Sequence, residues 1–446
     1  MHKKKSTLAK GNYRPVSLLP ITSKVFERAI FSQLSDYFEQ KFNPLLSAFR
    51  SGFGCNSILL KIVEDWKQIL DNNEYLAAIL MDLSKAFDCL PHDLLLLKAK
   101  HYGLSDSAQS LLSSYLDSRK QCVKLGDVLS SFSNIQKGVP QGSILGPLLF
   151  NIFVNDIFDF VKHGTLYNYA DDNTLSYHST SIEDLIDVLQ NESKSLTNWF
   201  HINHMKANPD KFQAIALGKK THDQEIVFDI DGALIHCEDE VNLLGVTFDF
   251  LLKFNTHVTN ISKKASRQLN VMKRLGHCLN KLAKVTMYHS FVLSNFNYCP
   301  LTWSFTNETN LKKLEKIQER ALRFIYHDKS SSYEDLLEQS GFPSLKIRRM
   351  RTIAIEAFKI TQKKCPEYLQ DLLSIKESNY NFRYSNKASL PNVRTTSYGK
   401  KSFRFNAPQI WNSLPNHFRE LSSFAQFKSL ITSWNGVSCR CSLCKM

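Results

Sequence analysis

Residues 165–177 read TLYNYADDNTLSY, with aromatic and aliphatic residues on both sides of a cluster of short polar ones. Aromatic and β-branched residues favour strands, and the central Asp171-Asp172-Asn173 has the composition of a turn. The segment therefore predicts a β-hairpin, with one strand on each side of the turn and two carboxylates at its tip.

A third carboxylate stands at the end of another predicted strand. Residues 75–81 form a short apolar run that ends at Asp82. If this strand and the hairpin are neighbours in one sheet, Asp82, Asp171 and Asp172 converge at the same sheet end. Clustered carboxylates repel one another, and their hard oxygens favour Mg²⁺, which takes further ligands from substrate phosphates. Two such ions suit nucleotidyl transfer, although each Asp taken alone is also an ordinary turn residue.

Helical periodicity alternates with strand patterns along the chain. Helices are predicted over residues 21–38, 94–102, 148–154, 181–200 and 311–325. A further strand is predicted at 121–125, followed by a turn at Gly126-Asp127. Strand–helix alternation around a hairpin predicts an α+β fold, and it argues against a doubly wound parallel sheet.

Charge divides the sequence into two unequal parts. Residues 1–250 hold 24 basic and 30 acidic side chains, a net charge of −6, whereas residues 251–446 hold 32 and 12, a net charge of +20. Residues 250–307 contain no acidic residue and eight Lys or Arg. Such a basic region suits the binding of nucleic-acid phosphates, and a solvated basic surface is the alternative interpretation.

Composition excludes several classes of protein. The chain has 446 residues, which predicts two to four domains, and its 43% hydrophobic and 22% charged residues exclude a wholly disordered chain or a collagen-like repeat. No run of about 18 apolar residues exists, so we expect no membrane span. Ten scattered cysteines indicate reduced thiols. We therefore expect an intracellular protein.

Several sequence boxes occur together and in a fixed order. They are NYRPVSLLP (12–20), SAFRSGFG (47–54), DLSKAFD (82–88), GVPQGSILGP (138–147), YADD (169–172), a segment from Trp199 to Lys211, and NLLGV (242–246). With these boxes the chain resembles the reverse transcriptases of non-LTR retrotransposons, of the LINE type and similar to jockey and CR1. The resemblance is close over about residues 10–250, and YGKKSF (398–403) and APQIWNSLP (407–415) resemble the family's C-terminal region. The family's N-terminal endonuclease has no counterpart in this sequence, so we do not expect nicking of target DNA.

The resemblance implies a right-hand polymerase built of fingers, palm and thumb. Residues 1–250 would form the fingers and palm, and residues 251–345 a helical, basic thumb. Residues 346–446 would form a C-terminal region that ends in a cluster of cysteines. Such an enzyme would extend a DNA primer with dNTPs on an RNA template.

The resemblance also implies roles for single residues. Two Mg²⁺ ions would be held by Asp82, Asp171, Asp172 and the backbone carbonyl of Leu83. Lys211 would donate a proton to the leaving pyrophosphate. The incoming nucleotide would be contacted by Arg14, Phe87, Gln141 and Gly142, and the duplex backbone by Lys263, Lys264, Arg267, Lys273 and Arg274.

Phe87, Arg14, Lys211 and the terminal cysteines also have simpler alternative interpretations. An aromatic ring at Phe87 would clash with a ribose 2′-hydroxyl and so select dNTPs, but a plain core phenylalanine fits the same pattern. Arg14 and Lys211 also suit ordinary surface charges. The terminal Cys439, Cys441 and Cys444 could hold Zn²⁺, but structural zinc usually takes four ligands, so free thiols are the alternative.

Two functions are compatible with the sequence. The first is RNA-directed DNA polymerisation, in which an element-encoded ribonucleoprotein is a potential assembly. The second is a non-catalytic remnant or repurposed copy that binds RNA without polymerising, consistent with the basic C-terminal half. The intact carboxylates at residues 82, 171 and 172 favour the polymerase.

Overall fold

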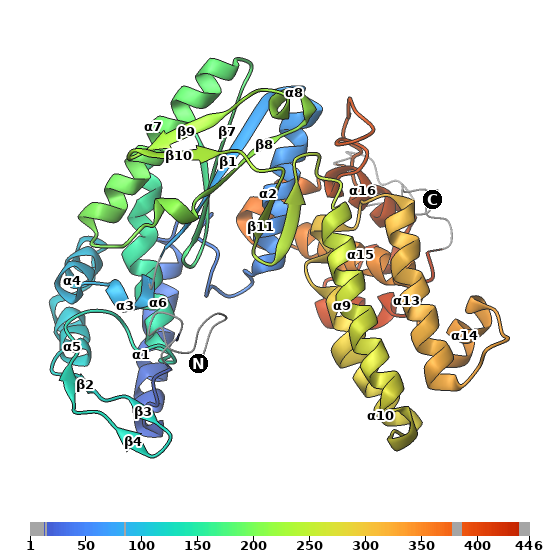
Figure 1. Cartoon of the computed structure of the whole chain (residues 1–446), viewed down its shortest axis with the longest axis horizontal. Helices are drawn as coiled ribbons and strands as arrows, with labels where there is room; N and C mark the ends of the chain where they lie inside the picture. The colour runs from blue at the N-terminus through green and yellow to red at the C-terminus, as the bar shows by residue number, and fades with distance from the viewer. Residues whose placement is uncertain (1–12, 14–15, 84–85, 377–385, 437–446) are drawn as a thin grey trace.

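A four-stranded antiparallel sheet lies at the centre of the N-terminal half of the protein (Figure 1). The computed structural model describes residues 13, 16–83, 86–376 and 386–436. The strands follow the order β6 (Thr165–Tyr169), β7 (Asp172–Ser179), β1 (Tyr75–Asp82) and β8 (Gln213–Leu217). The mixture of this sheet with many helices confirms the predicted α+β class.

Strand β1 is buried on both faces, because a hydrophobic core lies on each side of the sheet. Leu76, Ala78 and Leu80 face the core that contains helix α2 (Cys55–Asp71), whereas the alternate residues face the core that contains α7 (Ile182–Ile202). Successive side chains of a strand point to opposite faces. The continuous apolar run of β1 therefore follows from its double burial.

The remaining elements of the N-terminal half surround this sheet. The helices are α1 (Ile21–Glu39), α3 (Ala86–Cys89), α4 (His92–His101), α5 (Asp106–Leu116), α6 (Leu145–Val154), η2 (Asn155–Phe160), η3 (Pro209–Lys211) and α8 (Lys219–His222). Two separate hairpins follow, formed by β9 (Val227–Ile230) with β10 (Ala233–His236), and by β11 (Glu240–Leu243) with β12 (Val246–Asp249).

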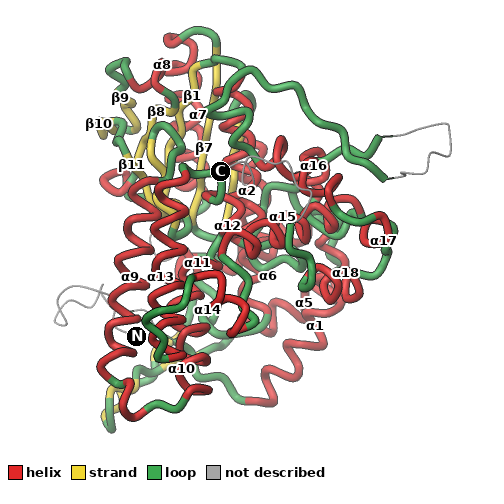
Figure 2. The backbone as a smooth tube through the Cα atoms, turned by 90° about the vertical axis from the view of Figure 1, so that its right-hand side faces the viewer, coloured by secondary structure: helices red, strands yellow, loops and turns green. Residues whose placement is uncertain are grey.

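The C-terminal half is helical, and α9 and α13 run side by side in both views (Figures 1 and 2). Its first part contains α9 (Asn255–Arg274), η4 (Gly276–Cys278), α10 (Lys281–Met287), a π-helical segment η5 (Tyr288–Leu293), α11 (Ser294–Asn297), α12 (Pro300–Trp303) and α13 (Glu308–Tyr326). Its second part contains α14 (Tyr333–Ser340), α15 (Leu345–Thr361), η6 (Glu367–Leu372), α16 (Phe403–Ser413), α17 (Asn416–Arg419) and α18 (Phe424–Ile431). Within the described residues, no helix has the length and apolar character needed to cross a bilayer.

The predicted helices are confirmed within a few residues at their ends, but two strand predictions need correction. In place of one strand at 121–125, two-residue strands β2 (Lys120–Gln121) and β3 (Lys124–Leu125) pair with β5 (Ser133–Asn134) and β4 (Val128–Leu129) in an exposed arm. No hydrophobic core covers this arm, so the alternating pattern has no buried face. The central hairpin turns at Ala170 and Asp171, because Tyr169 already pairs with Asp172.

The polar side of α2 holds a distant part of the chain. The Glu64 carboxylate accepts hydrogen bonds from Phe403 N at 2.7 Å and Arg404 N at 2.8 Å, which satisfies the first amides of α16. One turn further along, buried Lys67 donates to the Lys401 carbonyl at 2.6 Å. Burial raises the pKa of Glu64 and lowers that of Lys67 to about 8. The C-terminal half is thus packed into the core of the N-terminal half.

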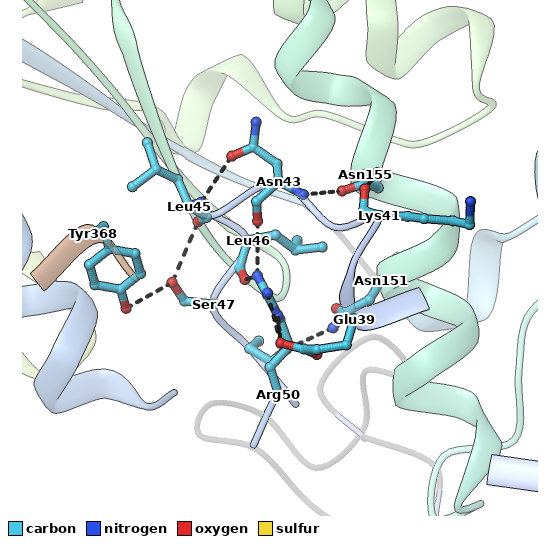
Figure 3. A network of polar contacts seen from close by, with 11 residues as sticks. Glu39, Lys41, Asn43, Leu45, Leu46, Ser47, Arg50, Asn151, Asn155 and Tyr368 are labelled. Atoms are coloured by element: carbon cyan, nitrogen blue, oxygen red, sulfur yellow. Dashed lines mark hydrogen bonds and ion pairs between the residues drawn. The ribbon is translucent and has the colours of Figure 1, made fainter. Parts of the chain in front are cut away.

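A polar network fixes the connection between α1 and α2 (Figure 3). The buried Arg50 guanidinium donates to the carbonyls of Asn43 at 2.9 Å and Leu46 at 2.7 Å, and it pairs with Glu39 at 2.8 Å. On one side of this connection Asn151 of α6 donates to the Ala48 carbonyl at 2.8 Å. On the other side the Tyr368 hydroxyl of η6 lies 3.3 Å from that of Ser47. The backbone around residues 47–50 is therefore held by both halves of the protein.

Candidate active site

One end of the central sheet brings carboxylates face to face. Asp82 is the last residue of β1, Asp172 is the first of β7, and the strand register makes them directly opposed partners. Such partners have Cβ atoms about 5 Å apart. Asp171 lies in the preceding turn, where its carbonyl accepts a hydrogen bond from Leu83 N at 3.4 Å. The structure thus gathers all four residues that the sequence assigned to metal binding.

The charges at this sheet end repel one another. Burial, and then the negative charges of Asp171 and Asp82, raise the pKa of Asp172 to about 6. A cation among these side chains would remove the repulsion. Within the described part of the chain, no three His, Cys, Asp or Glu side chains form a ready-made metal cluster. Carboxylate oxygens are ligands of hard divalent ions, and the pairing of Asp82 with Asp172 beside Asp171 would suit an ion that completes its coordination with water and substrate oxygens.

A cavity of about 270 Å³ opens beside the carboxylates. Its lining includes Asp82, Asp172, Lys211, Asn242, Leu244 and Gly245. Lys211, at the end of η3, places its Nζ 3.6 Å from Asp82 Oδ2, and about half of each side chain is exposed. A half-exposed ammonium at this position can offset negative charge in the cavity or donate a proton there.

The segments that carry Phe87 and Gln141 are joined by hydrogen bonds. Val139 N donates to the Phe87 carbonyl at 2.9 Å, and Gln141 Nε2 donates to Asp88 Oδ1 at 2.8 Å. Gly142 has a φ of +113°, and a Cβ there would lie 3.3 Å from a backbone oxygen. Only glycine adopts this conformation without strain, so the close approach of the backbone explains the Gln141-Gly142 pair.

Phe87 lies in a column of three aromatic rings. It stacks on Phe150 with ring centroids 4.4 Å apart, and Phe49 meets it edge-on at 5.8 Å. Phe87 itself is half-buried, and Phe49 is 49% exposed with a φ of +60°. Sequence analysis missed Phe49. Its signal was the SAFRSGFG box, in which the aromatic residue precedes the buried Arg50.

The five basic residues predicted to bind the duplex are all exposed on α9 or at its end. We call Lys263, Lys264, Arg267, Lys273 and Arg274 the basic stripe. The opposite face of α9 is buried through Val258, Ala265, Leu269 and Met272. The neighbouring α13 adds exposed basic residues that sequence analysis missed, although the polar face of its helical pattern signalled them: Lys312, Lys313, Lys316 and Arg320.

Two further predictions concern other parts of the chain. Arg14, assigned to the triphosphate, lies outside the described residues, as do Cys439, Cys441 and Cys444. By contrast, Leu244 and Gly245 line the cavity but were not predicted as site residues. Their signal was the NLLGV box, whose central Leu-Gly forms a hairpin turn.

Known proteins are similar to this chain over much of its length. The family model described as reverse transcriptase (RNA-dependent DNA polymerase) matches residues 1–248. The chain is similar to a probable RNA-directed DNA polymerase from transposon X-element of Drosophila melanogaster, with 30% identity over 71% of this chain and 36% of that protein. It is equally similar to the RNA-directed DNA polymerase from mobile element jockey of Drosophila funebris, with 30% identity over 72% of this chain and 36% of that protein.

The chain spans about a third of the length of these curated relatives. Among solved structures it is similar to apo telomerase from Candida tropicalis, with 13% identity and a TM-score of 0.42, over 74% of this chain and 53% of that one.

Proposed function

This chain belongs to the reverse transcriptase (RNA-dependent DNA polymerase) family, and from that premise we propose that it extends a DNA primer with dNTPs on an RNA template. Membership of the family also confirms the right-hand polymerase fold that the sequence implied. The observation that carries the proposal is the direct pairing of Asp82 with Asp172 at the sheet end, beside Asp171 and an open cavity.

The residues of the cavity suit two-metal nucleotidyl transfer. Asp82, Asp171 and the Leu83 carbonyl would hold the metals, and Asp172 would assist. Two bound Mg²⁺ ions would supply Lewis-acid activation of the primer 3′-hydroxyl and charge stabilisation of the leaving pyrophosphate. Lys211 would donate a proton to that pyrophosphate, since its ammonium already lies at the cavity wall.

The nucleotide and the duplex would be held by separate parts of the protein. Phe87, Gln141 and Gly142 would surround the incoming dNTP, with Arg14 on its phosphates. The basic stripe would hold the backbone of the RNA–DNA duplex without reading its sequence. An element-encoded ribonucleoprotein, a nuclear and cytoplasmic location and zinc at the terminal cysteines are further parts of this hypothesis.

Primer extension on an RNA template tests the proposal directly. With purified protein, Mg²⁺ and dNTPs, we expect extension by the wild type and a loss of at least about a hundredfold in Asp171→Asn, because a metal ligand supplies several kcal/mol. Asp231→Asn is the matched control, since Asp231 is likewise an aspartate in a hairpin turn, is exposed, and lies between β9 and β10. Binding of the RNA–DNA duplex, measured by fluorescence anisotropy, should persist in both variants.

Two results would contradict the proposal. If Asp171→Asn extended the primer as fast as the wild type, the carboxylates would have no part in the chemistry. A wild type that binds RNA tightly and salt-dependently but never extends a primer would favour the alternative, a non-catalytic RNA-binding copy.

A further inference from the structure

The hairpin of β11 and β12 presents its turn to the carboxylate cavity. The turn consists of Leu244 and Gly245, with φ values of +47° and +79°, as two-residue hairpin turns of the primed type require. Gly245 N donates to Asn242 Oδ1 at 3.2 Å, which closes the turn. All three residues line the cavity that Asp82 and Asp172 also line. The turn therefore forms part of the wall of the cavity that the carboxylates also line.

A tyrosine from the helical half of the protein holds this turn from outside the cavity. The Tyr298 hydroxyl donates to the Leu244 carbonyl at 2.7 Å. Its ring lies against Gly245, where a Cβ would meet the ring at 3.5 Å. Burial raises the pKa of Tyr298, so the hydroxyl keeps its proton and remains a donor. The contact therefore persists at any pH at which the enzyme would work.

Tyr298 is itself fixed by a rigid support. It lies between α11 and α12, and its carbonyl accepts a hydrogen bond from Trp303 Nε1 at 3.0 Å. Trp303 is buried and packs at 5.8 Å against the ring of His257 on α9. The next residue, Cys299, is buried with a φ of +43°, a conformation that a non-glycine residue adopts only when its surroundings impose it. The tyrosine is thus placed by the packing of this helical layer.

The hairpin has a second attachment to the same layer. Thr247 N, on β12, donates to His257 Nδ1 at 3.3 Å. His257 belongs to α9, the helix that carries the basic stripe. Strand β12 is therefore bound to α9, the helix that would hold the duplex, and the turn of the hairpin is bound to the adjoining segment between α11 and α12.

We infer that Tyr298 is a positioning residue that fixes the Leu244–Gly245 turn, and with it the 3′ end of the primer, opposite Asp82 and Asp172. The inference rests on the proposed function and deepens it. The primer end must enter the cavity that contains the carboxylates, and this turn is the wall against which it would rest. The tyrosine acts through the turn and touches neither the metals nor the nucleotide.

The experiment compares Tyr298→Phe with Tyr288→Phe. Tyr298→Phe keeps the ring against Gly245 and removes the hydroxyl, which donates to the Leu244 carbonyl and also interacts with the thiols of Cys55 and Cys299. Tyr288→Phe removes a hydrogen bond of similar length, 2.9 Å to Gln318, inside the helical half and away from the hairpin. Single-nucleotide extension is measured with a preformed primer–template duplex at saturating dNTP. A 2-aminopurine base at the primer 3′ end reports by fluorescence how that end is stacked.

We expect the extension rate of Tyr298→Phe to fall about three- to tenfold, the factor that corresponds to one hydrogen bond. Duplex affinity and the KM for dNTP should stay within about twofold, since the contacts that set them are intact, and the fluorescence of the primer end should change. Amide hydrogen exchange should accelerate over residues 240–249 and stay unchanged in α9 and α13. Tyr288→Phe should leave the extension rate, the fluorescence and the exchange of the hairpin unchanged.

Several outcomes would overturn the inference. If the extension rate and the amide hydrogen exchange of the hairpin were both unchanged, the hydrogen bond to Leu244 would not position the turn. A fall in rate that is matched by weaker duplex binding, or by faster exchange throughout the protein, would assign Tyr298 a general structural role. Failure of the wild type to extend would defeat the proposed function. If the wild type did not extend a primer but Tyr298→Phe showed faster amide exchange only in the hairpin, Tyr298 would anchor the turn without positioning a primer.

Discussion

Phe87 lies half-buried, with its ring stacked on Phe150 and met edge-on by Phe49. Its position is compatible with both of the roles that the sequence left open. The stacked face belongs to the hydrophobic core, because Phe150 is fully buried there. The backbone of Phe87 is held to Val139, two residues before Gln141, and we propose that the remaining edge of the ring faces the incoming nucleotide. A ring supported in this way cannot easily yield to an additional hydroxyl.

Shortening this side chain should therefore relax the choice of sugar. In Phe87→Val we expect the ratio of kcat/KM for rNTPs to that for dNTPs to rise at least about tenfold, the effect of losing a steric contact in a tight pocket. Single-nucleotide extension with rGTP and dGTP gives this ratio. Phe132→Val, in the exposed arm, is the matched control. Lower thermal stability with an unchanged ratio would assign Phe87 to the core alone.

At the scale of elements, the hairpin β11–β12 and the helix α9 meet at His257. Burial lowers the pKa of His257 to about 4, so the ring is neutral near pH 7. A neutral ring has one nitrogen that accepts a hydrogen bond, and Nδ1 does so from Thr247 N. Protonation would turn this acceptor into a donor opposite another donor. The junction between hairpin and helix therefore depends on an uncharged imidazole.

This junction predicts a pH dependence of stability. The folded-state pKa of His257 lies below its unfolded value of about 6.5, so its stabilising contribution is complete above pH 6.5 and is lost as the pH falls towards 4. Over that window the free energy of unfolding should decrease by up to about 3 kcal/mol. Urea unfolding at several pH values measures the free energy of unfolding of the wild type and of His257→Gln, and the difference between the two isolates the contribution of His257. If this difference did not vary with pH, the prediction would be contradicted.

The sequence predicted those features that depend on residues close together in the chain. The apolar run of residues 75–81 and the N-cap of α7 at Ser181, which accepts from Asp184 N, are local patterns, and the structure contains both. The pairing of Asp82 with Asp172 was predictable because it needed only that two strands be neighbours. The exposed arm at 120–134 was not, since alternation does not reveal whether a core covers the strand.

Contacts between distant segments escaped prediction for a physical reason. Tyr298 and Leu244 are separated by 54 residues, and no periodicity of either segment indicates that they meet. Phe49 meets the ring of Phe87, and it directly precedes Arg50, whose hydrogen bonds hold the loop between α1 and α2 (Figure 3). Such placements depend on tertiary packing, which single-sequence patterns do not encode.

At the scale of the whole molecule, the acidic candidate site and the basic stripe lie in different halves of the protein. The acidic residues of the site lie in the sheet-containing half, whose net charge is −6 over residues 1–250. The basic stripe lies on a helix of the other half, with further exposed basic residues on the adjacent α13. A polyanion would therefore be attracted to the helices and excluded from the carboxylates unless cations accompany it.

Two adjacent lysines of the basic stripe provide a test. Lys263→Ala/Lys264→Ala should weaken binding of an RNA–DNA duplex equally for all sequences and reduce the salt-dependence slope of log K by about two, one for each phosphate contact. The matched control is Lys219→Ala/Lys220→Ala, another exposed lysine pair, on α8 beside the sheet. Anisotropy titrations at several salt concentrations measure both slopes. If the two variants had equal salt-dependence slopes, the basic stripe would not contact the duplex.

The attachment of α16 to Glu64 has a consequence for how this protein is made. The two partners are 339 residues apart, so the nascent N-terminal half leaves the ribosome long before the segment that covers α2 exists. Contacts of such long range slow folding, because the intervening chain must first be ordered. Until residue 404 has been translated, a buried carboxylate and a buried ammonium face water, and apolar surface stays open to chaperones and proteases. A message cut short before that point would yield a chain that lacks the cover of α2, and we expect proteases to degrade such a chain faster than the full-length protein.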